Sequence, residues 1–243
     1  MNYLIDNFKR SAMALVAFAT IGLAGCSDND NDSPAPVVPP VVSPVMQDYN
    51  VTVTNLTANQ PMSPIAVVAH TSDSKLWSTG MAASVALEVL AESGDSSDLT
   101  DENGVNELVS GEGILVPGGA ETISLSLAQA DAANLSVVTM LVNTNDAFTG
   151  TTGFNLATLA VGDTSTLRVI AYDAGTEANS EAKGTIPGPA DGGEGFHTDR
   201  DDNDKVHGHP GVISADDGLA NSVLSASHRF DNPVMSIKIT RTQ

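Results

Sequence analysis

Short stretches in which apolar and polar residues alternate recur along the chain, and they predict β-strands. Residues 49–56 read YNVTVTNL, which places Val51 and Val53 on one face of a strand and Thr52 and Thr54 on the other. Further stretches that alternate or are rich in β-branched residues are 121–127, 135–144, 165–173 and 234–242. The pattern therefore predicts a chain built mainly of strands.

Two segments depart from this alternation. Residues 65–70 (IAVVAH) are almost continuously apolar, as expected of a strand buried on both faces. Residues 81–94 have helical spacing of apolar positions, and Gly94 is placed to end the helix. Turn signals such as VPGG at 116–119 separate the strands, and no internal repeat occurs. Many strands with few helices predict an all-β fold, an antiparallel β-sandwich with one or two short helices.

The first 26 residues have the composition of an export signal. Lys9 and Arg10 precede an uncharged, mostly apolar stretch that ends in LAGC at Cys26. This arrangement resembles the bacterial lipoprotein signal, in which the cysteine receives a diacylglyceryl group after cleavage. The resemblance implies a signal peptide at 1–25, a lipid anchor on Cys26 and export to the cell envelope, and Ser27 favours the outer membrane. Cys26 is the only cysteine, so the chain cannot form an internal disulfide.

Composition then divides the rest of the chain. Residues 26–47 are acidic and Pro-rich, which predicts an unfolded tether, and residues 48–243 are long enough for one domain with a full core. A net charge of −20 argues against nucleic acid and against anionic lipid surfaces as partners. The lipid anchor is then the only membrane contact expected. Aromatic residues make up 4% of the chain, too few for a large stacking groove.

An acidic turn follows the predicted strand at 165–173. Asp173 and Glu177 lie four residues apart around Gly175, and two carboxylates this close repel each other unless a cation lies between them. Calcium takes six to eight oxygen ligands, which carboxylates and irregular loops supply. The turn therefore predicts a calcium site; the alternative is a solvated acidic turn in which Gly175 supplies a positive φ.

Four segments together resemble the spondin N-terminal domain, found in F-spondin and mindin and as a lone domain in bacterial exported proteins. They are YNVTVTNLTANQPMSPIAVVAHT, LWSTGMAASVALEVLAESGD, DAGTEANSE and FDNPVMSIKITR, which span the folded part of the chain. The resemblance implies a β-sandwich related to C2 domains.

The same resemblance implies a calcium ion and its ligands. The family holds calcium with an aspartate after one central strand and two acidic residues in a D-A-G-T-D turn. Matched to this sequence, the ligands are Asp146, Asp173 and Glu177. Glutamate replaces the family's second aspartate here, and Asn145 and Ala147 stand where the family has Pro and Trp beside the first.

The loop at 195–211 is a second conspicuous segment, rich in Asp and His. Asp204 and Pro210 stand where an EF-hand needs Gly and Glu, so that motif is excluded. Two alternatives stay open beside a plain solvated loop. One is a looser calcium site, and the other is a zinc or copper site built from histidines. The residues considered for them are Asp199, Asp201 and Asn203, and His197, His207 and His209. A further histidine, His70, ends a buried strand and is expected to be a hydrogen-bonded core residue.

No phosphate-binding glycine loop, nucleophile elbow or HExxH motif occurs in the chain. The expected function is therefore non-enzymatic: a lipid-anchored, calcium-binding recognition or adhesion module with a surface or matrix ligand. Two alternatives are a metal-dependent enzyme that uses the histidine-rich loop at 197–209 and a structural envelope protein.

Overall fold

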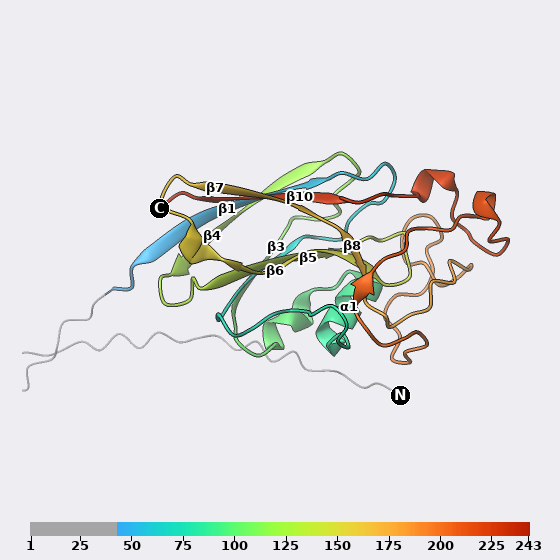
Figure 1. Cartoon of the computed structure of the whole chain (residues 1–243), viewed down its shortest axis with the longest axis horizontal. Helices are drawn as coiled ribbons and strands as arrows, with labels where there is room; N and C mark the ends of the chain where they lie inside the picture. The colour runs from blue at the N-terminus through green and yellow to red at the C-terminus, as the bar shows by residue number, and fades with distance from the viewer. Residues whose placement is uncertain (1–42) are drawn as a thin grey trace, which may run out of the picture. The chain divides into compact units, whose positions relative to one another are not determined.

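The computed structural model describes residues 43–243. The predicted signal peptide, the anchor residue Cys26 and most of the predicted tether lie outside the described residues. The described part forms one compact unit, and Figure 1 shows its two layers of strands. No helix among residues 43–243 has the length and apolar character needed to cross a membrane.

The first layer is a four-stranded sheet in the order β4-β1-β10-β7. All of its neighbouring strands are antiparallel, and the C-terminal strand β10 lies in its middle, between β1 and β7. The pattern of 49–56 is confirmed, because Val51 and Val53 are fully buried. The strands are β1 (Met46–Asn55), β4 (Ala120–Ala128), β7 (Thr164–Val169) and β10 (Met235–Arg241).

The second layer is a six-stranded antiparallel sheet in the order β3-β2-β5-β6-β8-β9. Its interior strand β2 is buried along its whole length, as its apolar run predicts. The strands are β2 (Ala66–His70), β3 (Val105–Ser110), β5 (Asn134–Met140), β6 (Ala147–Asn155), β8 (Ala171–Asp173) and β9 (His207–Gly208). The expected antiparallel β-sandwich is therefore confirmed.

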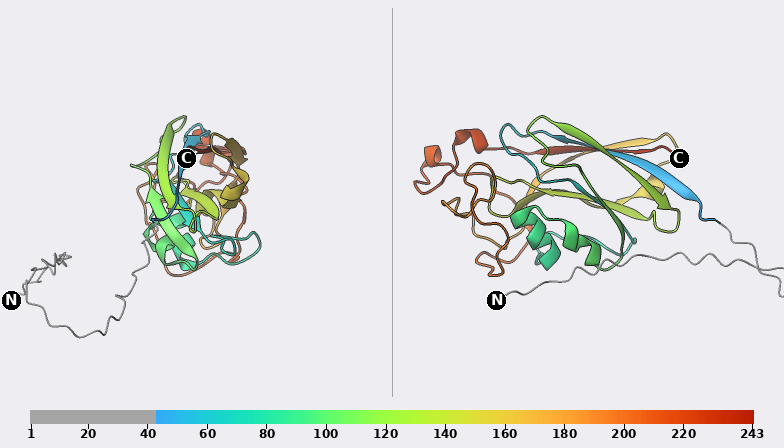
Figure 2. Two further views of the ribbon diagram at one scale, coloured as in Figure 1. Left: turned by 90° about the vertical axis from the view of Figure 1, so that its left-hand side faces the viewer. Right: turned by 180° about the vertical axis from the view of Figure 1, so that it is seen from behind.

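Two apolar cores explain why β2 is buried on both faces. Val67 belongs to the core between the sheets, together with Val51 and Ile237. Val68 points the other way, into a second core that contains Leu87 of helix α1. In Figure 2 the helix lies against the outer face of the six-stranded sheet.

Helix α1 (Val85–Ser93) begins after Ser84, whose side chain accepts a hydrogen bond from the Leu87 backbone. It ends at Gly94, which has a left-handed φ of 77° and so confirms the predicted stop. The remaining helical turns are short 3₁₀ segments: η1 (Ser97–Asp101), η2 (Leu156–Thr158), η3 (Ala215–Asp217) and η4 (Ala226–His228).

The structure divides one of the predicted strands into two. The stretch 165–173 is divided at Ile170, with β7 in the first sheet and β8 in the second. The chain therefore changes layer just before Asp173. The predicted strand 135–144 also ends early, at Met140, so that residues 141–146 form a buried connection to β6.

Candidate metal centre

The acidic turn lies at the end of the sandwich where β6 begins and β8 ends. These two strands are antiparallel, and Ala147 is paired with Asp173. Asp146, the residue before β6, is thereby placed beside Asp173, and its carbonyl accepts a hydrogen bond from Ala174. In Figure 1 this edge lies at the right, among the long connections that follow β8.

Asp146 is completely buried, and its two carboxylate oxygens differ in their contacts. Oδ2 accepts hydrogen bonds from the backbone N–H groups of Thr176 (2.9 Å) and Glu177 (3.1 Å). Oδ1 has no hydrogen-bond partner among the described residues. Burial, followed by the negative charge of Asp173, raises the pKa of Asp146 to about 7, against the opposing effect of these backbone donors.

Asp173 is also fully buried, and both of its oxygens are engaged. Oδ1 accepts a hydrogen bond from the Gly175 backbone (2.8 Å), and Oδ2 accepts one from Asn179 Nδ2 (2.6 Å). The Nδ1 atom of His207 lies 3.7 Å from Oδ1. The Asp173 carboxylate therefore has a fixed orientation, and its Oδ1 faces His207 in the loop 199–208.

Glu177 contributes to the same turn through its backbone, while its side chain points elsewhere. Its Oε1 accepts a hydrogen bond from Asn145 Nδ2 (3.0 Å), and its carboxylate lines an acidic cavity with Glu92, Glu194 and Asp201. Burial, together with the charges of these three residues, raises the pKa of Glu177 to about 7. The structure thus brings Asp146 and Asp173 together and turns the Glu177 carboxylate toward the cavity.

The loop 199–208 packs directly on the acidic turn. The backbone N–H of Asp204 donates to the Gly175 carbonyl (2.7 Å), and that of Asp201 donates to the Thr176 carbonyl (3.1 Å). Strand β9 pairs His207 with Asp173. Gly175 has a φ of 73°, and a Cβ atom there would lie 2.5 Å from the Lys205 carbonyl oxygen. The close packing of loop and turn therefore requires glycine.

This packing brings two residues to Asp173 that the sequence did not assign to one site. Ligand atoms of Asp173, Asp202 and His207 all lie within 4.8 Å of one another. It is the one group of three or more His, Cys, Asp or Glu residues in such an arrangement over residues 43–243. The abundance of Asp and His in this loop was the only signal in the sequence, and it does not indicate contact with Asp173.

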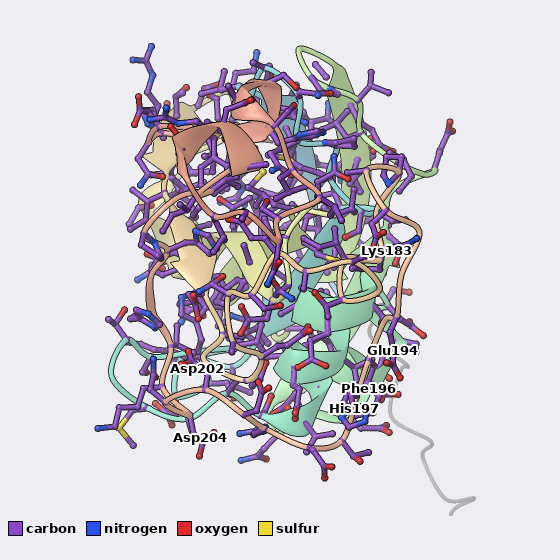
Figure 3. All side chains as sticks on the ribbon, turned by 90° about the vertical axis from the view of Figure 1, so that its right-hand side faces the viewer. Lys183, Glu194, Phe196, His197, Asp202 and Asp204 are labelled. Atoms are coloured by element: carbon purple, nitrogen blue, oxygen red, sulfur yellow. The ribbon has the colours of Figure 1, made fainter. Side chains whose placement is uncertain are left out.

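The three histidines of this loop do not gather at one point. His209 is buried, its Nε2 lies 3.0 Å from Asn179 Oδ1, and burial lowers its pKa to about 4. The His197 backbone instead donates to Glu92 Oε2 (2.9 Å). Figure 3 shows His197 beside Glu194 and well apart from Asp202. The prediction for His70 is confirmed, because it is buried and its Nε2 lies 2.8 Å from Ser136 Oγ.

The residues considered for a looser calcium site are used differently. Asp201 Oδ1 accepts a hydrogen bond from the Ala178 backbone (2.7 Å), and the Asp199 backbone donates to His197 Nδ1 (3.2 Å). Asn203 donates to Asp202 Oδ2 (3.0 Å). These contacts stabilise the loop and orient Asp202.

Comparison with known proteins adds one finding to this geometry. No curated protein matches the chain. The family model Spondin_N matches residues 51–185, which is more than half of the 243 residues. The matched region runs from β1 through the acidic turn after β8 and contains Asp146, Asp173 and Glu177. The chain therefore belongs to the Spondin_N family, the family of the spondin N-terminal domain.

Proposed function

We propose that this protein is a lipid-anchored surface module that binds calcium at the Asp146–Asp173 edge and recognises a surface or matrix ligand there, without catalysis. The calcium proposal rests on one observation: Asp146 Oδ1 is a buried carboxylate oxygen that has no hydrogen-bond partner among the described residues. A buried, unpaired charged group is costly, and a bound cation removes that cost.

The residues present fit calcium in their chemistry. Asp146 and Asp173 are two buried carboxylates whose negative charges repel each other, and this repulsion contributes to the raised pKa of Asp146. Calcium is a hard cation that takes oxygen ligands from carboxylates, backbone carbonyls and water. Glu177 is the third proposed ligand, and to serve as one its carboxylate has to turn from Asn145 toward the aspartates.

Calcium would hold together segments that are distant in sequence. The connection at 141–146, the turn at 173–177 and the loop at 199–208 meet at this edge. A cation bound to the first two also fixes the third, because the loop is hydrogen-bonded to the turn. The ordered edge is then the surface proposed to recognise a ligand, in keeping with the general use of loops on a rigid scaffold.

The proposed anchor rests on the sequence around Cys26, which lies outside the described residues. Mass spectrometry of the mature N-terminus tests it. An acylated Cys26 at the first position supports the anchor, and an unmodified Cys26 contradicts it.

Thermal melting with saturating calcium and then with a chelator tests the calcium site. We expect calcium to raise the melting temperature by several degrees, because a ligand of the native state stabilises it by mass action. Asp146→Asn keeps a side-chain oxygen for the Thr176 and Glu177 backbone donors but removes the charge. This variant should melt at a higher temperature than the parent in chelator, and calcium should no longer shift its melting temperature.

Asp131→Asn is the matched control, since Asp131 is exposed and precedes β5 at the opposite end from Asp146. It should keep the full calcium response. The calcium proposal fails if the parent shows no shift, or if Asp146→Asn responds to calcium as the parent does.

A further inference from the structure

The side chains of Asp173, Asp202 and His207 form a second, chemically distinct candidate site. We propose that they bind a divalent transition-metal ion of the Zn²⁺ type. Asp202 and His207 belong to a loop beyond residue 185, outside the region that the family model matches. Only Asp173 is shared with the proposed calcium site, so this inference does not rest on that proposal.

The distances suit a small cation. Asp173 Oδ1 and His207 Nδ1 are 3.7 Å apart, which is beyond hydrogen-bonding distance. Ligands of a tetrahedral Zn²⁺, bound at roughly 2.0–2.2 Å, lie roughly 3.4 Å from each other. All three residues offer ligand atoms within 4.8 Å of one another, and the exposed Asp202 side chain can close the remaining gap. The three groups thus need little movement to converge on one ion.

The ligand types distinguish this group from the calcium edge. Calcium sites are built from oxygens, whereas an imidazole nitrogen favours zinc, copper, nickel and iron. Two carboxylates and one neutral imidazole also balance the charge of a divalent ion. The group at His207 therefore selects for a different class of metal from the pair of aspartates.

Neighbouring groups hold two of the proposed ligands in place. The backbone of Gly175 and the side chain of Asn179 fix the Asp173 carboxylate, at 2.8 and 2.6 Å. Asn203 Nδ2 donates to Asp202 Oδ2 at 3.0 Å. Hydrogen bonds of this kind orient metal ligands and tune their affinity.

His207 can bind the ion through Nδ1 without a net change in its own protonation. Nδ1 lies 2.9 Å from the Lys205 carbonyl oxygen, to which it donates when it carries the proton. A metal ion that binds Nδ1 takes the place of that proton, and the neutral imidazole then carries its proton on Nε2. The Lys205 carbonyl oxygen, freed of this donor, can serve as the fourth ligand.

Isothermal titration of the purified, chelator-treated protein with Zn²⁺, in the presence of calcium, tests the proposal. We expect one Zn²⁺ to bind, and both His207→Ala and Asp202→Asn to lower its affinity by at least about 10-fold. His197→Ala is the matched control, because His197 is an exposed histidine of the same segment, placed well apart from Asp202. It should leave the affinity unchanged.

Cobalt gives a readout of the ligands themselves. Co²⁺ in this site should show visible absorption typical of a nitrogen-containing coordination sphere, and His207→Ala should remove that signature. Absence of Zn²⁺ binding by the parent overturns the proposal. So does a His207→Ala variant that keeps the parent's affinity, since the binding would then be adventitious.

The same variants distinguish the two proposed sites. His207→Ala should lose Zn²⁺ and keep the calcium-dependent rise in melting temperature. Asp146→Asn should lose the calcium response and keep Zn²⁺ binding. If Asp146→Asn also abolishes Zn²⁺ binding, the separate site proposed here is wrong.

Discussion

At the scale of single residues, Asp146 is completely buried, and its two carboxylate oxygens differ in their hydrogen bonding. One oxygen accepts backbone hydrogen bonds and the other has no partner among residues 43–243. Backbone donors favour the charged form of the carboxylate, whereas burial and the charge of Asp173 oppose it more strongly. Without a cation, the group is thus protonated more readily in the folded protein than in the unfolded chain.

The raised pKa of Asp146 in the folded protein predicts that stability depends on pH. The folded pKa of Asp146 is about 7, above the unfolded value of about 3.9. Its contribution to stability is therefore fully present below about pH 4 and is lost as the pH rises to about 7. In chelator, the melting temperature of the parent should fall relative to Asp146→Asn across this range by several degrees, since about 1 kcal/mol corresponds to roughly 2–4 °C.

Comparison with the variant is needed because other groups titrate in the same range. The pKa of His209 is lowered to about 4, so its contribution to stability increases with pH between about 4 and 6.5, the opposite direction. Saturating calcium should remove most of the difference between parent and Asp146→Asn, because the ion then compensates the charge. A difference that does not change with pH in chelator would contradict the raised pKa.

At the scale of elements, the proposed zinc site depends on how closely the loop 199–208 packs on the turn at Gly175. Gly175→Ala adds a Cβ atom 2.5 Å from the Lys205 carbonyl, in a left-handed conformation that itself costs about 1–2 kcal/mol. Gly184→Ala is the matched control, since Gly184 has a φ of 92° but no atom within 4 Å of its added Cβ. Urea unfolding should show a larger loss of stability for Gly175→Ala, and equal losses would contradict the packing argument.

The elements also show what the sequence could and could not predict. Alternation located β1, β4 and β10, because one face of each is buried between the sheets. Strand β6 (AFTGTTGFN) escaped prediction, since its glycines and threonines give no apolar alternation. The division at Ile170 was missed because local composition does not indicate which sheet a strand joins.

In the candidate site, too, local sequence patterns predict less than tertiary packing decides. Asp146 was placed with Asp173 only through the resemblance to the spondin N-terminal domain, and in the structure the two lie side by side because β6, which was not predicted, pairs with β8. The direction of the Glu177 carboxylate depends on Asn145, and the approach of His207 depends on a loop some 30 residues further along the chain. Such contacts are set by tertiary packing, and spacing in the sequence does not encode them.

At the scale of the whole molecule, the family match ends at residue 185, but the folded unit does not. Strand β10 fills the middle of the four-stranded sheet, where it pairs with both β1 and β7. Its residues Ile237 and Ile239 are fully buried in the core between the sheets. Residues 186–243 thus complete the sandwich and also carry Asp202 and His207.

A chain of residues 43–185 should therefore fail to fold. It would lack four buried apolar side chains of the main core, Val234, Met235, Ile237 and Ile239, and truncation of one such side chain costs roughly 1–5 kcal/mol. Together these losses are comparable to the whole stability of a domain, about 5–15 kcal/mol. The loss of β10 would also leave β1 and β7 with unpaired edges that favour aggregation. Circular dichroism should show no cooperative melting of the shorter chain, and size-exclusion chromatography should show aggregated material. Residues 43–243 should melt in one transition. Cooperative melting of the shorter chain would mean that β10 is dispensable, and that the family region alone forms the folding unit.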